Sequence, residues 1–302
     1  MAISVVYKEK IDQLKRKFEQ QRLGKDDLLQ KIDEAEVPES VYNSNAIENS
    51  TLTLKETERI LLEMEADRDL DLREVFEAKN LARVTDYIRT KAKEQDLDKQ
   101  LILLLHQMLI SNIYDSIAGR FRKNHEYVRV GTHLAPAAKH IDRLMEQLLV
   151  EYAANTSAHI IEKISRFHLE FERIHPFVDG NGRIGRAMIN YQLIRSGFPT
   201  VIIRNRGKKE NYYPSFSEYI DDKSIKRMEK LLVLAVIESL HKRLAYLLGD
   251  EIVKLANHAK RKGKSVPAVL NAARRQTIPA FRKKNVWKIG KNYNHERAQR
   301  VE

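Results

Sequence analysis

The residues best suited to chemistry form one short run, from His175 to Arg186. His175 is the only side chain of this run that titrates near neutral pH, so it is the natural general base. Asp179 offers one hard oxygen ligand, which is enough for a Mg²⁺ ion held mainly by phosphate oxygens and water. Arg183 and Arg186 share a helix face on which each guanidinium can bind phosphate. These residue types predict a nucleoside-triphosphate site with a base aimed at an acceptor hydroxyl.

The same run contains the small and capping residues that a phosphate site needs. Gly180 and Gly182 have no Cβ, which lets a ligand approach the backbone closely and permits a positive φ. Asn181 between them is a good N-cap and can also donate a hydrogen bond. We also predict that Gly185 is one of the residues that bind the nucleotide. The simpler alternative is a glycine turn with a structural histidine and two surface arginines.

Two apolar helical segments are expected to hold this run. The segment before it, residues 157–174, has apolar side chains at a 4-3-4-3 spacing, which is typical of a buried helix face. The segment after it turns five apolar residues inward and ends at Gly197. These inward residues are Ile184, Ala187, Met188, Tyr191 and Ile194. His175 therefore projects from a rigid support, and the backbone N–H groups that open the second helix are available to an anion.

The run resembles the signature of the Fic family, His-Pro-Phe-x-Asp/Glu-Gly-Asn-Gly-Arg-x-x-Arg, and matches it at every fixed position. The resemblance implies a mainly α fold, a Fic-type helical bundle with a short β-hairpin flap. It also implies an enzyme that moves AMP from ATP to a Ser, Thr or Tyr hydroxyl of a protein. In that family His175 would deprotonate the hydroxyl, and Asp179 would bind the Mg²⁺ that bridges the α- and β-phosphates.

The remaining roles follow from the same resemblance. Asn181 and the amides around Gly180 and Gly182 would stabilise charge on the α-phosphate. Arg183 would hold the β-phosphate and Arg186 the γ-phosphate. Relatives that transfer a phosphoryl group carry Lys at the position of Gly182, which argues against that chemistry. The family also places a tyrosine near the nucleotide base, which suggests Tyr212, although simple packing explains that residue equally well.

An N-terminal segment resembles the inhibitory helix of many Fic proteins, whose pattern is Ser/Thr-x-x-x-Glu-Gly/Asn. Ser44, Glu48 and Asn49 match it. The resemblance implies that the Glu48 carboxylate pairs with Arg186, occupies the place of the γ-phosphate and leaves ATP in an unproductive pose. In some relatives this glutamate orients a water that removes AMP from modified targets, so both roles stay open. From residue types alone, the segment is an exposed helix end with a solvated glutamate.

Most of the remaining sequence predicts helices. The expected helices cover residues 7–20, 25–36, a segment opened by Pro38, 54–67, 72–91, 101–109, 141–152 and 224–248. Thr53 and Glu56 form a capping box at the start of one of them. Residues 127–136 alternate and end in Pro136, which predicts a β-hairpin. It resembles the family's flap, which would hold a target segment as an added strand, and an ordinary surface hairpin is the alternative.

The C-terminal segment carries nearly all of the basic charge. From Asp250 onward there are 14 Lys and Arg against 4 Asp and Glu, which accounts for +10 of the net charge of +12. A helix over 251–260, a second helix from Ser265 and a hairpin over 282–290 resemble a winged helix-turn-helix module. Clustered Lys and Arg predict salt-dependent DNA binding, with Arg274 and Arg275 facing the groove. A solvated tail, or a module that docks acidic proteins or a second subunit, is the alternative.

Length and composition indicate three parts in this 302-residue chain. Residues 1–100 would form an N-terminal helical region with the inhibitory helix at about 38–50, residues 101–249 the catalytic core, and residues 250–302 the basic module. The absence of cysteine excludes disulfides and thiol catalysis. No signal peptide is evident, and the longest apolar stretch, Leu231 to Ile237, is too short to span a bilayer, so a cytoplasmic location is expected.

The leading hypothesis is an ATP- and Mg²⁺-dependent protein adenylyltransferase restrained by its own N-terminal helix. Its partner would be a protein with an exposed hydroxyl. Self-modification is a further expectation, with Ser44 as an acceptor if its helix swings free, and the resemblance also suggests a homodimer. Two alternatives remain. One is a nucleotide-sensing transcriptional regulator that binds DNA through its C-terminal module, and the other is a hydrolase that removes AMP with Glu48.

Overall fold

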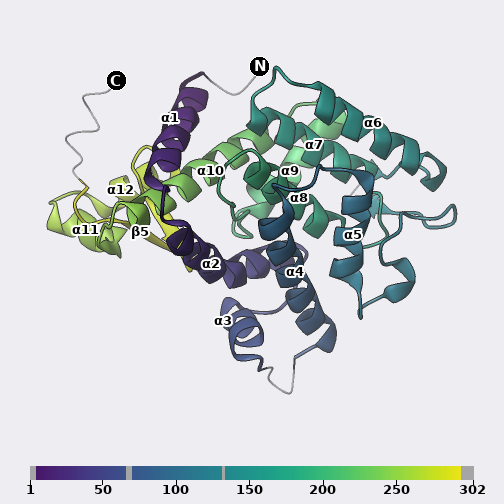
Figure 1. The fold of residues 1–302 in the computed structure, drawn as a ribbon, viewed down its shortest axis with the longest axis horizontal. Coiled ribbons are helices and arrows are strands. Elements are labelled where there is room, and N and C mark those ends of the chain that lie inside the picture. Colours follow the sequence, from purple (N-terminus) through teal and green to yellow (C-terminus); the bar gives the residue numbers. More distant parts are fainter. Residues whose placement is uncertain (1–4, 66–69, 131–132, 294–302) are drawn as a thin grey trace. The chain divides into compact units, whose positions relative to one another are not determined.

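The structure is a computed structural model that describes residues 5–65, 70–130 and 133–293. The expected mainly α fold with a short hairpin is confirmed (Figure 1). The chain forms two compact units: of the described residues, 37–197 and 202–232 belong to the first unit, and 5–36, 198–201 and 233–293 to the second. The division falls inside helices α2 (Asp26–Ile47) and α10 (Lys226–Leu247). Within the described residues, no helix combines the length and apolar character needed to cross a membrane.

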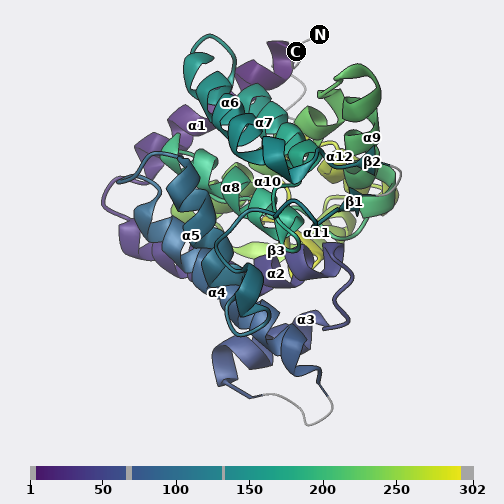
Figure 2. The same cartoon turned by 90° about the vertical axis from the view of Figure 1, so that its right-hand side faces the viewer.

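The first unit is a helical bundle centred on the two helices that flank the signature run. Helix α7 (Ile160–Ile174) packs against α6 (Ile141–Ala154), α8 (Asn181–Arg195) and α9 (Tyr213–Asp222). Helix α4 (Leu72–Lys91) packs against α8 and α5 (Lys99–Ile110), and Figure 2 shows α6 beside α7 and α4 beside α5. Short helical turns complete the unit: η1 (Arg59–Glu63), η2 (Asp115–Ile117), η3 (Ala138–His140) and η4 (Lys208–Tyr212).

The apolar residues predicted to face inward from α7 and α8 are found in this core. Ile164, Phe171 and Ile174 of α7 are fully buried, as are Ile184 and Met188 of α8. Such burial supplies about 1.5–3 kcal/mol for each large side chain. The signature run is therefore pinned at both ends by helices that share one core.

The prediction that Pro38 opens a new helix is wrong. Helix α2 is continuous from Asp26 to Ile47, with Pro38 in its interior. An internal proline removes one backbone hydrogen bond and costs about 3 kcal/mol. The turns after it are held by tertiary contacts, since Val41 and Ile47 are buried and Arg204 forms an ion pair with Glu39. Burial of these turns offsets the local cost, which local sequence rules do not weigh.

The capping box expected at Thr53 is confirmed. The Thr53 hydroxyl accepts a hydrogen bond from the backbone N–H of Glu56 at 3.2 Å, and the Glu56 carboxylate accepts one from the backbone N–H of Thr53 at 2.7 Å. This box opens α3 (Leu54–Glu58), which continues directly into the wider turns of η1. The helix expected over 54–67 thus ends early, and residues 66 and 67 lie outside the described residues.

The hairpin expected over 127–136 is confirmed. Strands β1 (Arg129–Val130) and β2 (His133–Leu134) pair antiparallel, with Arg129 opposite Leu134. The turn residues Gly131 and Thr132 lie outside the described residues. The His133 ring lies 3.1 Å from the backbone oxygen of Arg173, next to the end of α7. The hairpin is therefore attached beside the helix that delivers His175.

The second unit contains α1 (Val5–Gln21) and a small C-terminal module. The module runs through β3 (Ile252–Lys254), α11 (Leu255–Arg261), α12 (Val266–Arg274), β4 (Phe281–Lys283) and β5 (Val286–Gly290). Its antiparallel sheet has the order β3-β5-β4. The second helix and the hairpin are confirmed, but the helix predicted over 251–260 begins only at Leu255. The preceding residues pair with β5 as a strand, a long-range contact that their own sequence does not indicate.

Candidate nucleotide-binding site

The loop between α7 and α8 begins and ends with left-handed backbone. His175, at φ +50°, ends α7, and Gly180, at φ +83°, is the N-cap of α8. The prediction that Asn181 is the N-cap is therefore wrong by one residue. Its side chain instead clamps the loop, because its amide both accepts from the Phe177 N–H and donates to the Phe177 carbonyl, each at 2.9 Å. The buried Phe177 ring stacks on His106 with 3.7 Å between centroids, which anchors the loop in the core.

The imidazole of His175 lies against its own helix. Its Nδ1 is 3.3 Å from the Glu172 carbonyl oxygen and 3.6 Å from Glu172 Oε2. Arg122 donates to the His175 carbonyl at 2.8 Å, which fixes the backbone. Burial lowers the pKa of His175 to about 4, so the imidazole is neutral at physiological pH. Because Nδ1 faces Glu172, Nε2 is the nitrogen available to an acceptor hydroxyl.

Arg186 is buried and meets the end of α2. Its Nη2 donates to Glu48 Oε1 at 2.8 Å and to the Ser44 carbonyl at 2.9 Å, and its Nε donates to the Ser44 hydroxyl at 3.0 Å. The Glu48 carboxylate also lies against Gly182, since a Cβ on that glycine would be 2.1 Å from Oε1. The structure thus brings Ser44 and Glu48 together with the arginine predicted to hold the γ-phosphate. While α2 is in place, the Ser44 hydroxyl is buried.

The end of α2 is held by two residues that the sequence did not single out. Lys208 Nζ donates to the carbonyl oxygens of Ala46 at 2.7 Å and Ile47 at 3.0 Å, and to Asn49 Oδ1 at 2.9 Å. Tyr213 also donates through its hydroxyl to the Ile47 carbonyl. A cation on the last carbonyls of a helix is a favourable C-terminal cap. Asn49 therefore contacts this lysine cap and has no described contact with Arg186.

Asp179 and Arg183 belong to a closed ring of four charges. Asp179 accepts from Arg183 at 3.0 Å and from Arg73 of α4 at 2.9 Å. Glu77, one turn along α4, lies 3.1 Å from both Arg73 and Arg183. Arg183 is almost fully buried; its Nη1 is ion-paired with Glu77, but its Nε has no hydrogen-bond partner within the described residues. Buried N–H groups of this kind are expected to find an acceptor, and phosphate oxygens suit a guanidinium.

Two other predicted residues, Tyr212 and Gly185, lie near Arg186. The buried Tyr212 accepts through its hydroxyl from Arg186 at 3.1 Å and lies 3.0 Å from Nε2 of His168. Gly185 faces away from the loop, because a Cβ there would lie 2.6 Å from Glu172 Oε1 and 2.9 Å from His168 Nδ1. Tyr212 therefore contacts Arg186 directly, and Gly185 packs against side chains of α7.

The donor set suits a divalent cation only in combination with phosphate. Asp179 is the single carboxylate of the loop, and the described part of the chain holds no cluster of three or more His, Cys, Asp or Glu side chains able to bind a metal. Mg²⁺ typically keeps several waters and takes one or two carboxylates plus substrate phosphates. One aspartate beside Arg183, whose guanidinium is suited to phosphate, fits that mode of binding.

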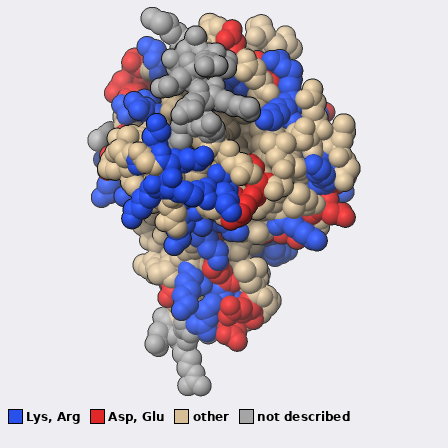
Figure 3. Space-filling model, turned by 90° about the vertical axis from the view of Figure 1, so that its left-hand side faces the viewer, with Lys and Arg blue, Asp and Glu red and all other residues tan. Residues whose placement is uncertain are grey.

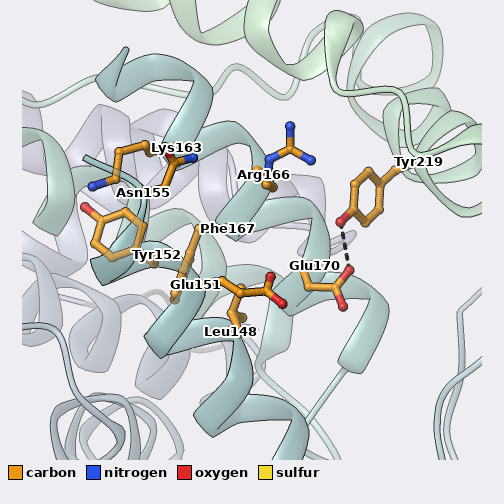
Figure 4. Close-up of a pocket in the computed structure, with 9 residues that line it drawn as sticks. All are labelled: Leu148, Glu151, Tyr152, Asn155, Lys163, Arg166, Phe167, Glu170 and Tyr219. Carbon is orange, nitrogen blue, oxygen red and sulfur yellow. Dashed lines mark hydrogen bonds between the residues drawn. The ribbon is translucent and has the colours of Figure 1, made fainter. Parts of the chain in front are cut away.

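A separate cavity lies between α6, α7 and α9 (Figure 4). Its wall carries both acidic side chains, such as Glu151 and Glu170, and basic ones, such as Lys163 and Arg166. Glu170 is already bonded, since it accepts from the Tyr219 hydroxyl at 2.8 Å. Its balanced charge and the absence of any signature residue from its lining distinguish this cavity from the nucleotide site.

Comparison with known proteins finds a family match in the part of the chain that contains the signature run. The Fic/DOC family profile matches residues 96–193. The protein adenylyltransferase Fic of Drosophila melanogaster is 30% identical over 176 residues, which cover 57% of this chain and 35% of that protein. The Drosophila willistoni protein of the same name is 31% identical over 178 residues. This chain thus spans about a third of the length of these curated relatives.

Solved structures establish the fold over a larger part of the chain. A Fic-domain-containing signaling protein from Bacteroides thetaiotaomicron superposes with a TM-score of 0.71 at 24% identity, covering 85% of this chain and 98% of that one. A Fic family protein from Desulfovibrio desulfuricans G20 has a TM-score of 0.65 at 21% identity, covering 98% of both chains. The family match over residues 96–193 agrees with the resemblance found in the signature run, and the solved structures show the same fold.

Proposed function

We propose that this chain is a protein adenylyltransferase that transfers AMP from ATP to a Ser, Thr or Tyr hydroxyl of a protein target. One observation carries the proposal. The neutral imidazole of His175 ends α7, and the buried guanidinium of Arg183, whose Nε has no hydrogen-bond partner among the described residues, lies on the first turn of α8. A base and an anion-binding helix start are thereby joined by one short loop. The names of the Drosophila relatives support the same activity.

The reaction is a displacement at the α-phosphorus. Nε2 of His175 takes the proton of the target hydroxyl while the hydroxyl oxygen bonds to the α-phosphorus. The bond from the α-phosphorus to the oxygen bridging it to the β-phosphate breaks, and pyrophosphate leaves with the electron pair. Arg183 and Arg186 would hold the β- and γ-phosphates, and the backbone N–H groups at the start of α8 would face the α-phosphate. Asp179 would hold Mg²⁺, which supplies charge neutralisation between the phosphates.

Glu48 restrains this reaction in the proposed scheme. Its carboxylate occupies Nη2 of Arg186, the donor that a γ-phosphate would need. Residues 37–49 belong to the same compact unit as the signature run, so the restraint acts within that unit. ATP then binds productively only when the end of α2 leaves Arg186.

The proposal is tested by following the position of the label. Glu48→Gly protein is incubated with Mg²⁺, a lysate of candidate targets, and ATP labelled at either the α- or the γ-phosphate. We expect label on protein from α-labelled ATP only, a mass increase of one AMP on a Ser, Thr or Tyr residue, and release of pyrophosphate. Glu48→Gly/His175→Ala is the matched control. Label from γ-labelled ATP, or equal labelling by the control, would reject the proposal.

Arg73→Ala is expected to lower the Mg²⁺ concentration that supports half-maximal ATP binding. Arg73 donates to an oxygen of Asp179 that a metal would need, and its side chain is 58% exposed. Exposed ion pairs are worth about 0.2–1 kcal/mol, so the Mg²⁺ requirement should change by about 1.4- to fivefold. Calorimetric titration of ATP at several Mg²⁺ concentrations measures it. Arg83→Ala, an exposed arginine on the same helix, is the control and should leave the Mg²⁺ requirement unchanged.

The C-terminal module supports a second function, binding of double-stranded DNA. Ala268, Asn271 and Arg274 of α12 are exposed, as is its C-cap residue Arg275, and their spacing places them on one side of the helix. Lys283 and Lys284 are exposed where β4 turns into β5. Figure 3 shows Lys and Arg gathered on the side of the molecule where α11, α12 and β5 lie in Figure 1. A second helix with a basic outer face beside a basic hairpin is the arrangement that winged helix-turn-helix readers use.

Arg274→Ala/Arg275→Ala is expected to weaken DNA binding and reduce its salt dependence. Removal of one phosphate-binding side chain should lower the slope of log K against log salt by about 1, so the double variant should show a slope lower by about 2. Fluorescence anisotropy of a labelled duplex at about 50–200 mM salt measures both quantities with the full chain. Arg83→Ala/Arg143→Ala removes the same charge from exposed sites in the other unit and should change neither. A wild-type protein that binds no duplex at low salt would end this second proposal.

A further inference from the structure

A buried carboxyl group lies directly behind the proposed general base. Glu172 precedes His175 by one turn of α7, is 8% exposed, and has its Oε2 3.6 Å from Nδ1 of His175. Its other oxygen, Oε1, is buried and has no hydrogen-bond partner among the described residues. A buried unpaired carboxyl oxygen is costly, so its presence here calls for a role. The proposed transfer reaction does not use it.

The surroundings of Glu172 connect the base to the γ-phosphate arginine. On the side of α8, the carboxyl packs against Gly185, where a Cβ would lie 2.6 Å from Oε1 and 2.9 Å from Nδ1 of His168. His168 in turn contacts the Tyr212 hydroxyl, which accepts from Arg186. A side chain larger than hydrogen at position 185 would separate these groups. Gly185 therefore lets the Glu172 carboxyl and the His168 ring approach the same point of α8, and His168 is linked through Tyr212 to Arg186.

We propose that Glu172 is the positioning residue of His175, and that Glu48 disables it together with Arg186. This inference rests on the proposed transferase function. With Glu48 withdrawn, the Glu172 carboxylate accepts a hydrogen bond from Nδ1–H of His175. Nδ1 already lies 3.3 Å from the Glu172 backbone carbonyl, which leaves Nε2 as the basic nitrogen; the carboxylate adds a charged acceptor that stabilises the imidazolium formed when the target proton is taken.

Charged and titratable groups face this carboxyl from four elements. Burial, the largest cause, and the carboxylate of Glu48 together raise the pKa of Glu172 to about 8, against the lowering effect of Arg186. His168 and His175 belong to its own helix, and Tyr212 faces it from η4. With Glu48 in place, Glu172 is therefore protonated at neutral pH. Removing Glu48 removes one cause of the raised pKa and leaves the lowering effect of Arg186, so the pKa of Glu172 falls and its carboxyl ionises more readily.

The same change acts on the base. Burial lowers the pKa of His175 to about 4, Arg122 and His133 lower it, and Glu172 (through its backbone) and Glu48 raise it. An ionised carboxylate within about 4–6 Å raises the pKa of a histidine by about one to three units. An ionised Glu172 would thus bring His175 toward neutral pH, where a general base works best. Glu48 then inhibits twice, at the phosphate site and at the base.

The test measures the pKa of His175 by NMR titration of the Cε1 proton, without nucleotide. We expect a value at least one pH unit higher in Glu48→Gly than in Glu48→Gly/Glu172→Gln. We also expect a higher value in Glu48→Gly than in wild type. Glu48 itself attracts protonated His175, so its removal alone would lower the value, and a rise points to Glu172. Glu48→Gly/Glu162→Gln alters a carboxylate elsewhere on α7 and should match Glu48→Gly.

Transfer assays give an independent readout. Glu48→Gly/Glu172→Gln should lose tenfold or more in kcat, keep its affinity for ATP within twofold, and show its acid limb at lower pH because the base has a lower pKa. Equal pKa values of His175 in Glu48→Gly and in Glu48→Gly/Glu172→Gln would overturn the inference. A lower pKa of His175 in Glu48→Gly than in wild type would also overturn it. The second comparison needs no change at Glu172, so it holds even if that variant fails to fold. Titration shifts without any AMP transfer would instead reject the transferase function alone.

Discussion

Glu48→Gly is expected to raise the rate of AMP transfer about ten- to hundredfold. The Glu48 carboxylate accepts a charge-assisted hydrogen bond from Arg186 at 2.8 Å, and Arg186 is only 4% exposed. A hydrogen bond to a charged group contributes about 1.5–3 kcal/mol, which is the advantage that the γ-phosphate must otherwise overcome. Glycine removes the carboxylate and frees Nη2 for the triphosphate. Incorporation of label from α-labelled ATP at saturating Mg²⁺ measures the change.

Two comparisons separate charge from helix packing. Glu48→Gln keeps the length of the side chain but removes the charge, so it should recover a large part of the gain. Lys208→Ala removes the cation that caps the last carbonyls of α2 and should give a smaller gain while Glu48 is intact. Unchanged labelling in Glu48→Gly would show that the contact with Arg186 does not limit transfer.

His175→Ala, made in the Glu48→Gly background, is expected to reduce transfer by about 10²–10⁴-fold. That range is the usual contribution of a positioned general base. The affinity for ATP should change less than twofold, because the described contacts of His175 are with Glu172 and Arg122 and not with Arg183 or Arg186. Single-turnover labelling gives the rate, and calorimetry gives the affinity.

The backbone at this position requires a second variant. His175 has φ +50°, which alanine tolerates poorly and asparagine accepts more readily. His175→Asn should therefore lose transfer to the same extent while unfolding at the temperature of its parent. His133→Ala removes a nearby histidine that contacts the end of α7 and should retain most of the activity. Transfer preserved in His175→Asn would exclude histidine as the base.

The signature run could be predicted because its information is local. Spacing alone placed Phe171 and Ile174 of α7 in the core, and fixed residue types identified His175, Asp179 and Arg183. The residues that complete the site could not be found in this way. Arg73 and Glu77 form a charged turn of α4, which is typical of a solvated surface, and they reach Asp179 only through tertiary packing.

Other differences have the same origin. The strand Ile252–Lys254 exists because β5, more than thirty residues later, pairs with it. Pro38 stays within a helix because the turns after it are buried, a term that local rules do not include. In the sequence, Glu172 resembles any acidic residue near the end of an amphipathic helix. Only the structure shows that its carboxyl packs against Gly185 of α8. Long-range contacts decide each of these cases.

The ring of Asp179, Arg183, Glu77 and Arg73 has a consequence for how ATP arrives. Two guanidinium groups and two carboxylates cancel at short range, and Arg186 is likewise neutralised by Glu48. A dipolar arrangement of this kind projects little potential beyond a Debye length, so it does not draw a polyanion from solution. ATP must instead displace the carboxylates paired with Arg183 and Arg186 one at a time after it contacts the site. Its association rate should then be nearly independent of ionic strength, unlike capture of a nucleic acid by exposed lysines.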